Sequence, residues 1–228
     1  MNKRFDFHTH TSRTLNEDNS LYCHGDFDFY IPENQYFCLG IHPWFILDTK
    51  QLKKIENLVK KQSDNPFLIG IGEIGLDKRQ GPLFAKQLLF FEEQVKMANK
   101  HSLAFIVIHI VKAYQEVFNI LIKYNFKGTI LLHDFHGNQK TLEQFQKNFK
   151  IYISYNIHSF KRKNTLEIIT KAKTSIILPE SDENDPKSID DVNRKLCHLF
   201  RIDLENLKKI HASAFNNLIT KENSFPIE

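Results

Sequence analysis

Short apolar runs recur along the chain at intervals that suit a repeated strand and helix. Each run holds four to six residues and is nearly continuous, without regular alternation of polar positions. Continuous runs are typical of strands that are buried on both faces of a parallel sheet. The runs that predict strands lie at 4–7, 36–41, 67–71, 104–108, 129–132, 151–154 and 175–178.

Helical periodicity fills most of the intervals between these runs. Apolar residues spaced three and four apart occur at Phe84, Leu88, Phe91, Val95 and Ala98, and again at Val117, Ile120, Leu121 and Tyr124. Asp48 and Gln51 predict a capping box for a further helix. Helical patterns at 189–199 and 204–219 would close the bottom and the side of the fold. The alternation of strand and helix predicts a wound parallel α/β fold with right-handed crossovers.

A closed TIM-type (β/α) barrel is favoured over an open sheet, because candidate site residues follow nearly all the strands. The segment 11–35 is too short for the helix, strand and helix that a complete barrel needs there. Residues 20–24 could form a vestigial strand in this segment. We therefore predict one domain over residues 1–228, a barrel that is irregular or seven-stranded in its first quarter.

Composition narrows the possible settings for this domain. The 228 residues are 41% hydrophobic and 25% charged, and no apolar stretch approaches the roughly 20 residues of a membrane span. The N-terminus lacks the apolar core of a secretory signal, which predicts a cytoplasmic protein without a membrane partner. The three cysteines form no CxxC pair, so free thiols are expected. A net charge of +4 is too small to indicate nucleic-acid binding.

The first candidate site residues are two histidines in the motif FDFHTH. His8 and His10 alternate at the end of a predicted strand, so both imidazoles can point the same way and bind one ion. Glu73, in GEIGLD, follows another strand among glycines that permit close backbone approach. Either motif alone also fits an ordinary structural role. A carboxylate at the mouth of a barrel would more naturally bridge two cations.

Three further residues stand at equivalent places. His109 ends one apolar run, His133 ends the next, and Asp182 follows the last in LPESD. A single such histidine is more often a buried core residue, but identical placement on successive strands favours a shared site. Four histidines and two carboxylates suit Zn, Mn or Fe better than Ca, as one or two divalent ions. The expected chemistry is hydrolysis, with Asp182 able to accept a proton from the attacking water.

These motifs resemble those of the TatD family of metal-dependent deoxyribonucleases, which are amidohydrolase-type barrels. The matching motifs, in chain order, are FDFHTH, GIHPW, GEIGLD, FIVIH, HDFHG and PESD. The resemblance implies that His8, His10, Glu73, His109, His133 and Asp182 are the metal-binding positions, with Glu73 as the bridge and Asp182 also as the base. It further implies hydrolysis of DNA phosphodiester bonds, often from the 3' end, with Zn, Mn or Mg as the cofactor.

The chain departs from the family pattern in three places. Val111 stands where the family usually has an arginine, and the adjacent Lys112 is a candidate to replace its phosphate contact. His136 stands where serine is common. The short segment 11–35 resembles that of a shorter subset of the family.

Other residues are candidates for binding substrate or orienting ligands. Lys161, Arg162 and Lys163 could clamp phosphate, although such a triplet is more often a solvated helix start. His42 in GIHPW could hold a phosphate oxygen and Trp44 could stack on a base, or both could belong to a packed turn. The candidates for orienting ligands from outside are Asp77, His136, Asn138 and Asn156. We assign no role to the remaining histidines.

Three functions remain open from the sequence. The first is a divalent-metal deoxyribonuclease that acts on single strands or ends of DNA. The second is a metal-dependent deacylase or amidohydrolase, because the same site could hydrolyse an ester or a cyclic amide. The third is a subunit of a multi-protein assembly, such as a defence complex, that uses the shortened first quarter as its partner surface.

Overall fold

Eight parallel strands form one sheet in chain order, from β1 to β8, in the computed structural model, which describes residues 4–12, 18–23 and 30–220. The strands are β1 (Arg4–Thr9), β2 (Asp18–Cys23), β3 (Tyr36–Leu39), β4 (Leu68–Asp77), β5 (Phe105–Val111), β6 (Thr129–Leu132), β7 (Lys150–Tyr155) and β8 (Ile177–Pro179). The prediction of a TIM-type barrel is confirmed. Its seven-stranded alternative is wrong, because β2 occupies most of the segment predicted as a vestigial strand.

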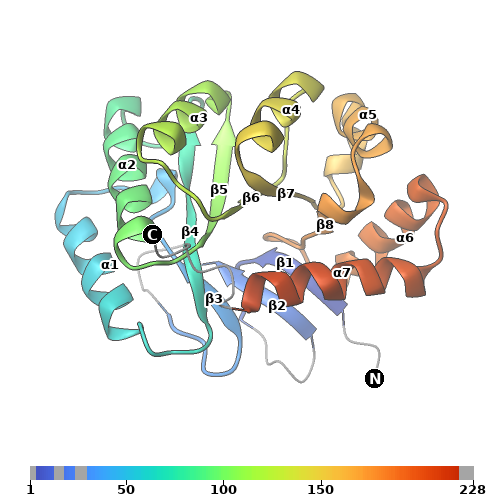
Figure 1. The fold of residues 1–228 in the computed structure, drawn as a ribbon, viewed down its shortest axis with the longest axis horizontal. Helices are drawn as coiled ribbons and strands as arrows, with labels where there is room; N and C mark the ends of the chain where they lie inside the picture. The colour runs from blue at the N-terminus through green and yellow to red at the C-terminus, as the bar shows by residue number, and fades with distance from the viewer. Residues whose placement is uncertain (1–3, 13–17, 24–29, 221–228) are drawn as a thin grey trace.

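Helices follow the strands from β3 onward and cover the outside of the sheet (Figure 1). They are α1 (Lys50–Lys61), α2 (Phe84–Lys100), α3 (Tyr114–Lys123), α4 (Gln139–Asn148), α5 (Lys163–Lys171), α6 (Ser188–Phe200) and α7 (Leu204–Ile219). Three single 3₁₀ turns lie at η1 (Pro43–Phe45), η2 (Ser159–Lys161) and η3 (Thr174–Ile176). Within the described residues, no helix lies between β1 and β3. Most of the segment on which the predicted irregularity depends, residues 13–17 and 24–29, lies outside the described residues, so that prediction stays open.

Two strands extend further than the apolar pattern predicts. Strand β4 runs through the whole of LIGIGEIGLD, so Glu73 lies inside it, and β5 continues past His109. Both residues were predicted at strand ends. The glycines of β4 explain the difference, because they interrupt the apolar pattern while allowing β5 to approach. A Cβ at Gly75 would lie 1.9 Å from the carbonyl oxygen of His109, and one at Gly72 would lie 2.7 Å from the Cβ of Val107.

The barrel closes between β8 and β1 through the residues that follow β8. Asp182 forms an isolated parallel bridge with Thr9. Its amide donates to the carbonyl of His8 at 3.0 Å, and its carbonyl accepts from the amide of His10 at 3.3 Å. The buried carboxylate of Asp6 accepts hydrogen bonds from Ser181, at 2.9 Å from the amide and 2.7 Å from the hydroxyl. This closure places Asp182 directly beside His8 of β1 and His10, which follows β1.

Helix α7 covers the end of the barrel at which β1 and β3 begin. Phe215 packs its ring against Phe5, Phe7 and Tyr36. The helix therefore closes the bottom, as its sequence pattern predicted. Cys23 and Cys38 are buried free thiols and Cys197 is a half-buried one, which confirms the cysteine prediction. Among the described residues, no helix combines the length and the apolar character needed to cross a membrane.

Candidate metal centre

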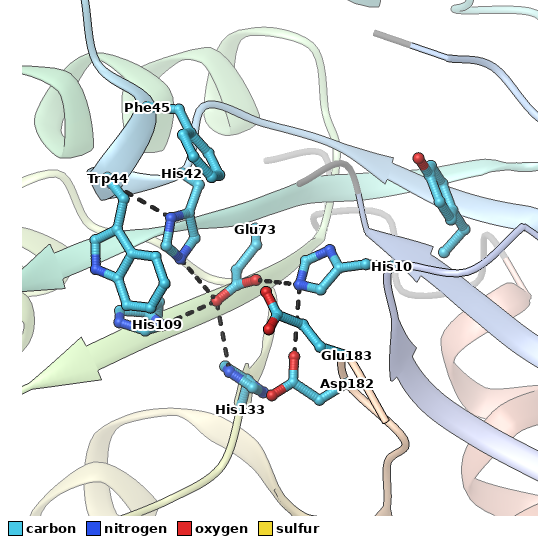
Figure 2. Close-up of a pocket in the computed structure, with 10 residues that line it drawn as sticks. His10, His42, Trp44, Phe45, Glu73, His109, His133, Asp182 and Glu183 are labelled. Atoms are coloured by element: carbon cyan, nitrogen blue, oxygen red, sulfur yellow. Dashed lines mark hydrogen bonds and ion pairs between the residues drawn. The ribbon is translucent and has the colours of Figure 1, made fainter. Parts of the chain in front are cut away.

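The six predicted ligands converge at one end of the barrel, around Glu73, and Figure 2 shows all of them except His8. They come from widely separated strands or from the residues just after them: His8 from β1, His10 just after β1, Glu73 from β4, His109 from β5, His133 after β6, and Asp182 after β8. Parallel strands bring their carboxyl ends to a single face, which is why such distant residues can share a site. The cleft above them has a volume of about 250 Å³.

Glu73 divides its two carboxylate oxygens between two groups of histidines. Oε2 lies 3.3 Å from Nε2 of His8 and 3.2 Å from Nε2 of His10. Oε1 lies 3.0 Å from Nδ1 of His109, 3.5 Å from Nε2 of His133 and 3.4 Å from Nε2 of His42. A carboxylate whose oxygens face separate ligand groups is arranged to bridge two cations.

Asp182 completes the group on the Oε2 side of Glu73. Its Oδ1 lies 3.5 Å from Nε2 of both His8 and His10. The backbone φ of Asp182 is 55°, in the left-handed region that side chains seldom adopt. The closure of the barrel holds it there, because both its amide and its carbonyl are bonded to the backbone of β1.

The buried polar atoms of the centre fit a divalent ion. Both ring nitrogens of His8 and Oε2 of Glu73 are buried and make no hydrogen bond. Buried polar atoms without a partner cost free energy, so such atoms are rarely left unpaired. Imidazole nitrogens and carboxylate oxygens are the ligands that zinc, manganese and iron prefer. The residues present can therefore hold a divalent metal.

The outward nitrogens of two candidate ligand histidines are bonded to fixed acceptors. Nδ1 of His10 lies 2.8 Å from the carbonyl oxygen of Cys23, and Nδ1 of His133 lies 3.0 Å from Oε2 of Glu180. A neutral imidazole carries one proton, so donation by Nδ1 leaves a lone pair on the inward Nε2. Both rings therefore present a nitrogen that can bind a cation.

Glu180 is the residue of this centre that the sequence analysis missed. It is fully buried, and besides His133 it accepts hydrogen bonds from the hydroxyl of Ser154 and, at 3.4 Å, from Nδ2 of Asn156. A carboxylate bonded to the outer nitrogen of a metal-ligating histidine fixes the orientation of the ring. The available signal was its place in LPESD, directly after a buried strand.

Two of the predicted orienting residues lie where they can support ligands. Asp77 accepts from Nε1 of Trp44 at 2.8 Å and lies 3.4 Å from Nε2 of His109. Asn156 reaches the centre only through Glu180. The remaining two lie elsewhere: the side chain of Asn138 caps helix α4 by accepting from the amide of Thr141, and His136 contacts Asp134 and Arg162.

Only some of the predicted phosphate-binding residues lie at the cleft. His42 and Trp44 line the cleft, whereas Lys112, Lys161, Arg162 and Lys163 are not among its lining residues. The three lysines are exposed. The guanidinium group of Arg162 instead donates to the carboxylate of Asp134.

The buried charges at the centre stabilise one another. Burial works against ionisation of Glu73, but the surrounding histidines hold its pKa well below its usual range. Burial opposes protonation of His133, but Glu180 and Glu73 raise its pKa well above its ordinary value, so a cation that binds its Nε2 would displace a proton. For Asp182, burial again opposes the charge, whereas His133 and His8 keep its pKa low. Glu73 and Asp182 are therefore carboxylates at neutral pH, as metal ligands must be.

Comparisons with solved structures show the same fold. The TatD homologue YJJV of Escherichia coli is 18% identical with a TM-score of 0.77, and the match covers 94% of this chain and 97% of that one. An uncharacterized amidohydrolase from Saccharomyces cerevisiae is 15% identical with a TM-score of 0.78, over 95% of this chain and 99% of the other.

Sequence comparisons identify the family. A putative deoxyribonuclease TATDN1 homolog from Enterocytozoon bieneusi is 28% identical over 156 residues, which are 63% of this chain. The match spans about half of that relative, 53% of its length. Residues 29–220, most of the chain, match the family described as TatD related DNase. The chain therefore belongs to the TatD related DNase family.

Proposed function

We propose that this protein is a divalent-metal-dependent hydrolase that cleaves phosphodiester bonds in DNA. The observation that carries the proposal is the placement of Glu73, whose two oxygens each face a different group of candidate ligands. Family membership supports DNA as the substrate. The proposal that the protein acts as a deacylase has no comparable observation in its favour.

The candidate ligands could hold two ions, with Glu73 available to both. His8, His10 and Asp182 would hold one ion on the Oε2 side, and His109 and His133 would hold the other on the Oε1 side. Divalent ions bound there supply Lewis acidity to a phosphate and lower the pKa of water towards roughly 7. We propose two ions, with Zn, Mn or Mg as the candidates.

Asp182 is the base in this proposal. Its carboxylate lines the cleft and is ionised, so it can accept the proton of the attacking water. His42 lies across the cleft, beside the other oxygen of Glu73, and is placed to contact a phosphate oxygen. Trp44 and Phe45 form an aromatic wall on which a base could stack.

The size of the cleft favours a single strand or a strand end as substrate. A cleft of about 250 Å³ admits one unpaired nucleotide more readily than a base-paired duplex. Lys112, Lys161 and Lys163 are exposed and lie outside the cleft lining, so we assign them contacts with more distant phosphates. Protein partners at the first quarter and a cytoplasmic location remain predictions from the sequence.

A cleavage assay with a charge-removing variant tests the function. Purified protein is incubated with labelled single-stranded DNA and Mn²⁺, with and without chelator. The parent should cleave only without chelator, and Asp182→Asn should be strongly impaired. Glu183→Gln is a matched control, because Glu183 also lines the cleft but is exposed and adjoins the proposed base. Equal cleavage by Asp182→Asn and the parent would eliminate the role of Asp182.

The same protein preparation can distinguish the nuclease from the deacylase alternative. If the parent leaves DNA intact but hydrolyses an aminoacyl ester in a chelator-sensitive way, the site is a metal-dependent hydrolase with another substrate. That result would replace the nuclease proposal while leaving the metal centre in place.

A further inference from the structure

The outward ring nitrogen of His42 accepts a hydrogen bond, whereas the outward nitrogens of two nearby histidines lie beside acceptors. Its Nδ1 accepts a hydrogen bond from the backbone amide of Trp44 at 3.2 Å. His10 and His133 instead direct their outward nitrogens at oxygen acceptors. Because an accepting nitrogen carries no proton, the neutral ring of His42 has its proton on Nε2, the nitrogen that points inward.

Position alone would make His42 a metal ligand. It forms a compact group with Glu73 and His109 whose ligand atoms all lie within 4.8 Å of one another. A protonated ring nitrogen has no lone pair for a cation, so the bond from Trp44 removes His42 from the ligand set. The inward N–H faces Oε1 of Glu73 at 3.4 Å and is available to an oxygen acceptor in the cleft.

The surroundings of His42 hold this arrangement in place. The residue is the N-cap of the turn η1, and the rings of Trp44, Phe45 and His109 pack around it at centroid distances of 4.8, 5.5 and 4.7 Å. The indole of Trp44 is itself fixed, because Nε1 donates to Asp77 at 2.8 Å. The amide that bonds Nδ1 of His42 therefore belongs to a residue anchored at both backbone and side chain.

We infer that His42 is a fixed hydrogen-bond donor to a non-bridging oxygen of the scissile phosphate and not a ligand of either metal ion. The inference rests on the proposed function and names the residue that would bind the phosphate independently of the ions. A donor held in place before the reaction stabilises charge that develops on the phosphate without reorganising. Since His42 is buried at the edge of the cleft, this donor is shielded from competing water.

Nitrogen NMR of the Zn²⁺-loaded protein tests the proton position directly. Long-range ¹H–¹⁵N spectra should show His42 as the Nε2–H form, with no change in its tautomer when chelator removes Zn²⁺. His10 and His133 should show Nδ1–H forms in the loaded protein. Adding inorganic phosphate should shift the Nε2–H resonance of His42. An Nδ1–H form of His42, or a metal-bound shift at its Nε2, would overturn the inference.

Zinc stoichiometry and cleavage of paired variants supply the second test. His42→Leu should bind as much Zn²⁺ as the parent, whereas His109→Gln should bind less. Cleavage of single-stranded DNA should fall about 100-fold in His42→Leu, as when one transition-state donor is removed, and His42→Gln, which keeps an N–H donor, should recover part of the loss. Loss of Zn²⁺ from a folded His42→Leu protein would refute the donor assignment.

These tests also separate the two proposals. A parent protein that fails to cleave DNA defeats the nuclease proposal, whereas the tautomer of His42 and the zinc content of its variants are measured without any substrate. The response to inorganic phosphate then decides whether His42 binds phosphate at all.

Discussion

The region from β4 to β8 and the region from β1 to β3 place candidate metal ligands by different means. In the first, helices follow successive strands, and the candidate ligand His133 is oriented by the carboxylate of Glu180. In the second, the described residues contain no helix between the strands, and His10 is oriented by the main-chain carbonyl of Cys23. Asp182 is likewise held by backbone bonds to β1.

The difference shows that the two regions hold candidate ligands through different kinds of hydrogen bond. Backbone bonds depend on strand pairing, and β1, β2 and β3 pair in parallel. The short region from β1 to β3 therefore orients its candidate ligands through main-chain groups.

The largest effect is expected from removing the charge of Glu73, the residue that faces both groups of candidate ligands. In Glu73→Gln the shape is kept but the bridging charge is lost, so both ligand groups lose their common carboxylate. We expect DNA cleavage to fall by about 1000-fold, because metal-assisted stabilisation is worth several kcal/mol. Binding of Mn²⁺, followed by calorimetry, should weaken at both sites. Loss at one site only would mean that the two regions bind metal independently.

The next test addresses the side-chain partners of the β4 to β8 region. Glu180→Gln and Asp77→Asn should each weaken Zn²⁺ binding by roughly 10 to 100-fold, the usual cost of losing a partner of a ligating histidine. Zinc titration against a competing chelator measures the effect. Glu183→Gln, which alters an exposed carboxylate at the same cleft, should match the parent. Unchanged affinity in Glu180→Gln would show that packing alone orients His133.

A third test addresses the backbone closure next to the short region. Asp6→Asn should lower the free energy of unfolding by about 1–3 kcal/mol, because the amide keeps one acceptor oxygen and its NH2 group would face one of the two donors of Ser181. Urea unfolding measures this change, and metal affinity should fall with it because Asp182 follows Ser181. Asp190→Asn is the control: its 3.6 Å pair with Arg4 is exposed, so it should change stability by less than about 0.5 kcal/mol. Equal stability of both variants would contradict the role given to the closure.

The smallest effect concerns the helix that covers β1. His211 of α7 is buried against Phe7, and burial lowers its pKa to about 3 although the backbone of Ile177 favours its protonated form. The unfolded chain binds this proton below pH 6.5 or so, whereas the folded protein does not until about pH 3. Stability should therefore fall with decreasing pH in this window, by about 1.4 kcal/mol per unit from this group.

His211→Leu isolates that contribution. The difference in unfolding free energy between the variant and the parent should grow in favour of the variant between pH 7 and pH 5. Apo protein is used for both, so that metal release at low pH does not enter the comparison. A difference that is constant with pH would show that His211 is protonated in the folded protein.

Local pattern in the sequence was sufficient for the barrel and for the six candidate ligands. Continuous apolar runs marked most strands, and histidines or carboxylates at or just beyond those runs marked the face where parallel strands end. The apolar pattern was insufficient where glycines interrupt it. Strand β4 was therefore predicted too short, and Glu73 was placed after the strand instead of inside it.

The tertiary structure decided which nitrogen of each histidine faces the candidate metal centre and which outer residues hold the ring. Glu180 and His133 are 47 positions apart, and the amide that sets the polarity of His42 belongs to a residue whose side chain is anchored by Asp77. Such roles follow from distances between chain segments, which residue type and spacing do not encode. The sequence by itself thus determined which groups could bind metal, and only packing determined which of them present a lone pair and which a proton.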